Sequence, residues 1–280
     1  RPQHPTYRLP RKKNGVETDR VTRKREISPT EKPKKNSMNR LPTALVILLA
    51  TQITAQTAPP ASFRVVAKIF GSNSNQPVTE NLTLFDSGVA YDVSIGGARF
   101  LTVYDPAQER VTLLDRFTQV QTTLSRDDLV RIVAQARATI KDPDDQAKLG
   151  LHAKVQVAPA GERYQIQFGN FQYVATTQTS DHPTAAADYG RFVDLAARLN
   201  LVRRLGPPPF GRMTLNDSIT RDNRLPLELT RTVTRGSVAE VHRKTHQLTE
   251  SLTDADRDQI NQIQSMMTLY RQVPPAEFPK

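Results

Sequence analysis

Apolar and polar residues alternate along short segments in the first half of the chain. In residues 63–70, Phe63, Val65, Ala67 and Ile69 lie on one side of a two-residue repeat. This period is typical of a β-strand with one buried face. Five more strands are expected at 78–85, 89–95, 100–104, 111–114 and 118–124. The segments between them are short and rich in turn residues, so we expect neighbouring strands to be antiparallel.

The period changes after residue 124. Ser125 and Asp128 have the spacing of a capping box, and apolar residues at helical spacing follow as far as Ile140. A second helix is expected from Thr184 to Leu199, ended by the proline-rich segment 206–210. A third follows another capping box at Thr253.

Strand patterns return at 152–158, 163–176, 225–234 and 238–248. Pro226 lacks a backbone N–H, which favours an edge position for its strand. The pattern predicts an α+β fold, with a curved, mostly antiparallel sheet resembling a half-barrel. About three amphipathic helices would cover one face. We expect residues 62–272 to form a single domain and 273–280 to be a flexible tail.

The net charge of +11 is concentrated at the N-terminus. Residues 1–37 hold 12 Lys and Arg against 4 Asp and Glu, whereas the chain from Gln56 onward holds 26 against 24. We interpret 1–37 as a disordered basic leader, or as an over-extended start that precedes the true one at Met38. The alternative is a basic arm for nucleic acid or anionic lipid. Without this segment no basic stripe remains, so no nucleic-acid partner is expected.

Residues 38–55 have the layout of a secretory signal peptide. Arg40 precedes a run of seven apolar residues at 44–50, and small residues follow. The run is far shorter than the ~20 residues that span a bilayer. A buried core helix is the alternative, but Pro42 and the polar change at Thr51 disfavour it. We therefore expect cleavage near Ala55 and a periplasmic or extracellular protein with no membrane span in the mature chain.

Few residues have the spacing of a chemical site. His242 and His246 would share a zinc ion on a helix, but on a strand they lie ~13 Å apart. Asp254–Asp258 resembles the start of a calcium loop without its glycine and its glutamate, and Asp142–Asp145 is typical of a turn. The chain has no cysteine, which excludes disulfides, thiolate metal sites and cysteine nucleophiles. We predict no catalytic residue, no metal site and no cofactor.

Several segments carry a resemblance to other proteins. Residues 85–92, 103–106, 111–115, 206–216 and 246–256 resemble a family of uncharacterised exported bacterial proteins, found especially in planctomycetes. The resemblance covers roughly 62–272 and implies no known activity. More remotely, the order of strands and helices is similar to that of periplasmic lipoprotein carriers, which hold acyl chains in the concave face of a half-barrel.

The carrier analogy implies a set of ligand-binding side chains. The candidates are Phe63, Val65, Leu84, Tyr91, Phe100, Val111, Leu113 and Phe210. The alternative for all of them is simple packing against the helices.

Three functions follow from these patterns. The favoured one is a non-catalytic interaction or structural module of the cell envelope, with an unknown envelope protein as partner and a filled core. The second is a carrier for an apolar ligand such as a lipid or a lipoprotein acyl chain, which requires an open apolar cavity. The third is an enzyme, in which His242 or His246 would meet a carboxylate such as Asp217 or Glu240.

Overall fold

The computed structural model describes residues 62–279 except 73, 98 and 204–208. The expected leader (1–37), the signal peptide (38–55) with its cleavage near Ala55, and part of the proline-rich segment (206–208) lie outside the described residues.

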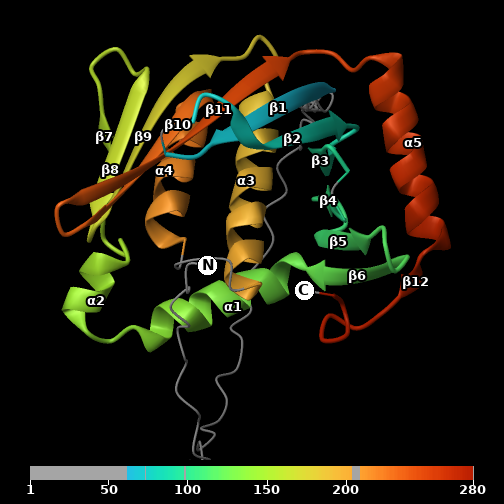
Figure 1. The fold of residues 1–280 in the computed structure, drawn as a ribbon, viewed down its shortest axis with the longest axis horizontal. Coiled ribbons are helices and arrows are strands. Elements are labelled where there is room, and N and C mark those ends of the chain that lie inside the picture. The colour runs from blue at the N-terminus through green and yellow to red at the C-terminus, as the bar shows by residue number, and fades with distance from the viewer. Residues whose placement is uncertain (1–61, 73, 98, 204–208, 280) are drawn as a thin grey trace, which may run out of the picture. The chain divides into compact units, whose positions relative to one another are not determined.

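Twelve strands form one sheet in the described part of the chain (Figure 1). They are β1 (Phe63–Phe70), β2 (Pro77–Asp86), β3 (Val89–Ile95), β4 (Phe100–Asp105), β5 (Arg110–Asp115), β6 (Val120–Ser125), β7 (Gln156–Val157), β8 (Arg163–Phe168), β9 (Phe171–Thr179), β10 (Arg224–Arg235), β11 (Val238–Thr249) and β12 (Arg271–Gln272).

The sheet is open, and its order is β12-β6-β5-β4-β3-β2-β1-β11-β10-β9-β8-β7. All pairs are antiparallel except β12 with β6. The predicted strands in the first half are confirmed. The strand expected at 163–176 is instead a hairpin of β8 and β9, and only two residues of 152–158 form β7.

Five helices accompany the sheet in the described ranges: α1 (Arg126–Thr139), α2 (Pro143–Lys148), α3 (Ala185–Val202), α4 (Phe210–Arg221) and α5 (Asp254–Leu269). Both predicted capping sites are confirmed. The Ser125 hydroxyl accepts a hydrogen bond from the Asp128 N–H, and Thr253 and Asp256 cap each other reciprocally. Neither α2 nor α4 is predicted from the sequence.

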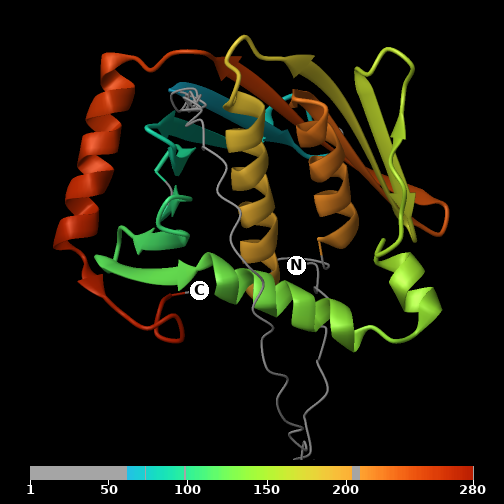
Figure 2. The same ribbon diagram turned by 180° about the vertical axis from the view of Figure 1, so that it is seen from behind.

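The sheet curls around α3 and α4, while α5 lies outside it (Figures 1 and 2). Phe63, Val65 and Phe85 pack with Tyr189 and Phe192 of α3 in what we call the concave cluster. The helices that contact the sheet therefore lie on both of its faces, and not on one as the sequence predicts.

The convex cluster lies on the other face. Leu82, Leu84, Tyr91 and Val93 pack there with Ile260 of α5. Because β2 to β4 contribute apolar side chains to both clusters, this part of the sheet is buried on both sides.

Two further expectations are wrong. The strand containing Pro226 is β10, which lies between β9 and β11. The missing N–H is tolerated because Pro226 is paired only with Thr177 of β9, while the pairing with β11 begins at Glu228 after a register shift. The expected flexible tail contains Val273 and Phe278, which are buried in the concave cluster. β12 fastens this segment to β6.

A buried carboxylate fixes the turn between β5 and β6. Asp115 is fully buried, and its Oδ2 accepts hydrogen bonds from Arg99 Nε (2.9 Å) and Nη2 (2.6 Å). Its Oδ1 accepts from the Phe117 N–H (2.9 Å). The Arg99 guanidinium is the main cause that lowers the pKa of Asp115 to about 2.

We expect Asp115→Asn to lower the free energy of unfolding at pH 7 by about 2–4 kcal/mol, because a buried ion pair loses one partner. The folded pKa lies below the unfolded one, so this stabilisation is present above pH ~4 and is lost as pH falls toward 2. Urea denaturation at pH 7 and pH 3 measures both effects. Asp217→Asn, in an exposed pair with Arg221, is the control, and an equal loss in both variants would contradict the assignment.

α3 and α4 approach closely at Gly190. A Cβ atom built there overlaps the Thr220 side chain, with Thr220 Cβ itself at 3.1 Å. We expect Gly190→Ala to destabilise the fold by about 1–3 kcal/mol through overpacking. Thr220→Ala should recover part of that loss in the double variant. Gly71→Ala, which meets its first neighbour at 3.8 Å, is the control in the same thermal-denaturation series.

Candidate functional site

The structure separates the eight predicted ligand-binding side chains into three groups. Phe63, Val65, Val111 and Leu113 are buried in the concave cluster, and Phe100 packs against it. The others lie elsewhere. Leu84 and Tyr91 are in the convex cluster, and Phe210 packs with Val133 and Leu151. The protein's own helices cover members of each group.

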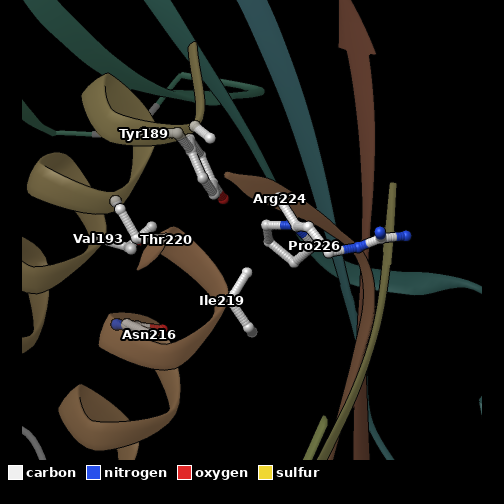
Figure 3. A pocket seen from close by; sticks show the side chains of 9 residues that line it. Tyr189, Val193, Asn216, Ile219, Thr220, Arg224 and Pro226 are labelled. Atoms are coloured by element: carbon white, nitrogen blue, oxygen red, sulfur yellow. The ribbon is translucent and has the colours of Figure 1, made fainter. Parts of the chain in front are cut away.

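A cavity of about 10 Å³ lies between α3, α4 and β10 (Figure 3). Tyr189, Asn216 and Thr220 line it from the helices, and Arg224 and Pro226 line it from the strand. This volume holds about one water molecule. A ligand larger than a water molecule therefore does not fit in this cavity.

Charged or titratable side chains of β3, α3, α4 and β11 form a series of electrostatic neighbours. We call Asp92 (β3), Asp194 (α3), Arg212 (α4), Lys244 and His246 (both β11) the inner polar cluster. Electrostatic coupling links Lys244 to Arg212 and Asp92, and links Arg212 to Asp194. His246 couples to both cations.

Strand register explains why β3 and β11 contribute to this cluster. Residues directly opposite each other in an antiparallel pair share a face. Val65 of the concave cluster lies opposite Thr83, and Thr83 lies opposite Asp92. Two positions along β1 from Val65, Ala67 lies opposite His246, and Lys244 is two positions further along β11. All three charged or titratable side chains are therefore on the concave side.

Neutral donors satisfy the two carboxylates of the cluster. The Thr83 hydroxyl donates to Asp92 Oδ1 (2.7 Å), and the Asn216 amide donates to Asp194 Oδ1 (3.0 Å). Burial raises the pKa of both carboxyl groups, although these hydrogen bonds oppose the shift. Neither carboxylate forms an ion pair within 4.0 Å in the described part of the chain.

The two cations of the cluster are also without ion-pair partners among the described residues. Arg212 Nη1 is buried with no hydrogen-bond partner there. Burial and the positive charge of Arg212 lower the pKa of Lys244 to about 8, and Asp92 acts in the opposite direction. Both side chains keep partial solvent exposure. Because its pKa is about 8, the Lys244 ammonium is still mostly protonated at pH 7.

His246 is 7 % exposed, and the backbone of Leu227, a hydrogen-bonding group near its ring, partly opposes the lowering of its pKa. Its ring meets the ring of Tyr189 edge-on, with centroids 5.9 Å apart. Burial, followed by the charges of Lys244 and Arg212, lowers the pKa of His246 well below 6.5. The imidazole is neutral at pH 7, and one nitrogen is then a donor and the other an acceptor.

The other residues considered for chemistry already have partners or cap helices. His242 Nε2 lies 2.8 Å from Glu240 Oε1, its neighbour on the same strand face, and Asp217 forms an ion pair with Arg221. Asp142 caps α2, and Asp256 caps α5. The described residues contain no group of three or more His, Asp or Glu arranged to hold a metal ion.

Sequence reasoning missed four of the five cluster members, because Asp92, Asp194, Arg212 and Lys244 match no motif. It considered His246 only as a metal ligand with His242 or as an enzyme residue beside a carboxylate. The available signal was the two-residue repeat of the strand. It places Lys244 and His246 on the same face as Leu248, which packs against the concave cluster. Using that signal requires knowing that β11 pairs with β1.

The chain matches no protein-family model, and a search of curated proteins finds no significant match. No helix in the described ranges is long and apolar enough to cross a membrane.

We expect Lys244→Met to raise the free energy of unfolding at pH 7 by about 1–2 kcal/mol, because it removes a charge that burial disfavours. The folded pKa of about 8 lies below the unfolded value of 10.5. Wild-type stability therefore rises between pH 8 and 10.5, and the advantage of the variant shrinks there. Lys68→Met, on the opposite face of neighbouring β1, should change little. Lower stability of Lys244→Met at pH 7 would contradict this account.

Proposed function

We propose that the protein is a non-catalytic binding module of the cell envelope that holds a ligand between α4 and the concave face of the sheet. One observation carries the proposal: two buried guanidinium nitrogens, Nη1 of Arg212 on α4 and Nε of Arg231 on β10, have no hydrogen-bond partner among the described residues. Buried polar groups are normally hydrogen-bonded, and each orphan costs about 1–3 kcal/mol. A bound polar group would supply the missing partners.

This proposal combines two of the functions expected from the sequence. A filled core, expected for an interaction module, agrees with the packing of α3 on Phe63, Val65 and Leu113. A purely apolar ligand would have to displace that helix. A polar ligand group needs only to reach Arg212 and Lys244, which are partly exposed already.

An enzymatic role has less support. His246 is neutral at neutral pH and has no carboxylate within hydrogen-bond distance among the described residues, so nothing there activates it as a base. His242 has a carboxylate neighbour in Glu240, and both lie toward the β10–β11 hairpin, on the side of Lys244 that is away from His246. The envelope location rests on the signal-like segment 38–55 alone.

Native mass spectrometry of the full-length protein, purified from the cells that produce it, tests the proposal. We expect a stoichiometric small-molecule adduct on the wild type and on Arg221→Met, whose guanidinium lies on the exposed side of the same helix. The adduct should fall at least about tenfold in Arg212→Met, because a charge-assisted contact is lost.

Circular dichroism of both variants serves as the check that they fold. A wild type that carries no adduct would contradict the binding module and favour an interaction module, whose partner crosslinking would then identify. An adduct that persists in Arg212→Met would place the ligand elsewhere.

A further inference from the structure

We propose that the inner polar cluster binds an oxyanion, a carboxylate or phosphate group, between the Arg212 guanidinium and the Lys244 ammonium. This inference rests on the proposed function and names the chemistry of the ligand.

Buried aspartates elsewhere in the described part of the domain form ion pairs, and the inner polar cluster can be compared with them. The three aspartates buried in the described residues are each paired with an arginine: Asp115 with Arg99, Asp188 with Arg191, and Asp256 with Arg64. The inner polar cluster departs from this rule, because its cations and carboxylates lie within electrostatic range but not in ion pairs. Two partly buried positive charges therefore lack a counter-charge in contact.

The chemistry of the groups favours an anion over a cation. A guanidinium presents a planar fork of N–H donors that fits two oxygens of a carboxylate or phosphate, and an ammonium adds a point charge. Asp92 and Asp194 already receive hydrogen bonds from Thr83 and Asn216. The two positive groups of the cluster would repel a bound cation, and its two carboxylates would repel an anion in the same way. The preference for an anion therefore rests on the buried N–H groups of Arg212 Nη1 and Arg231 Nε, which an oxyanion can satisfy and a cation cannot.

The surroundings of the cluster suit an oxyanion from more than one source. Arg231 lies diagonally across from Lys244 on the concave face, one register step along β10 from Leu229, and its buried Nε also lacks a partner among the described residues. On the other side, His246 touches Tyr189 of the concave cluster. The ligand is thus either a free oxyanion or the head group of an amphiphile whose chain contacts that cluster.

Isothermal titration of the full-length protein with inorganic phosphate, acetate and decyl phosphate at low salt and pH 7 tests the inference. We expect at least one of the three to bind. Lys244→Met should weaken that binding by about tenfold or more, whereas Lys244→Arg should retain most of it. Lys68→Met is the matched control, because Lys68 lies on adjacent β1 opposite Thr245 and therefore faces the other side of the sheet.

A second readout covers the case in which Lys244→Met does not fold. The NMR-detected pKa of the Lys244 ammonium in the wild type should rise when the anion binds, because a neighbouring negative charge favours the protonated form. Tighter binding of decyl phosphate than of phosphate would identify an amphiphile, and equal binding a free anion. Either result supports the inference.

Two results would overturn it: no binding of any of the three anions, or equal weakening by Lys244→Met and Lys68→Met. The outcome for the proposed function is separate. A neutral adduct that depends on Arg212, with no anion binding, would leave the binding module in place and remove only the oxyanion. Absence of any adduct together with absence of anion binding would remove both.

Discussion

The close approach of α3 and α4 is the constraint on which the interior depends. Gly190 has no side chain where it meets Thr220, so the two helices lie side by side within the curve of the sheet. α3 then covers the concave cluster, and Leu215 and Ile219 of α4 cover Tyr164, Ile166 and Leu229. The same placement brings Asp194 of α3 within electrostatic range of Arg212 of α4, and Arg212 within range of Lys244 on β11. The position of the helices thus sets both the packing and the charge arrangement.

The two halves of the sheet differ in how many of their faces are covered by helices. β2 to β4 are covered on both faces, and Arg64 on β1 reaches Asp256, so one carboxylate both caps α5 and holds it to the sheet. The convex side of β9 to β11 instead carries residues such as Thr176, Thr230 and Gln247. A helix on only one face is sufficient there, because the other face is polar enough to meet water.

Local patterns explain what the sequence could predict. Period two and short turns specified most strands, and two capping sites specified helix starts. α4 escaped prediction because Pro209 precedes it without a side-chain cap, and its proline-rich approach resembles a helix end. The inner polar cluster escaped because its charges come from β3, α3, α4 and β11, which meet only through tertiary packing. No spacing within one segment encodes that meeting.

The position of β1 in the middle of the sheet has a consequence for how the chain folds. β1 to β6 join through local hairpins, whereas β1 meets β11 only when residues near 64 find residues near 249. Pairings of such high contact order are slow to form, because loop closure comes before any gain from the contact. Until β11 arrives, one edge of β1 stays open to other chains. We therefore expect the pairing of β1 with β11, in the middle of the finished sheet, to be the slow step of folding.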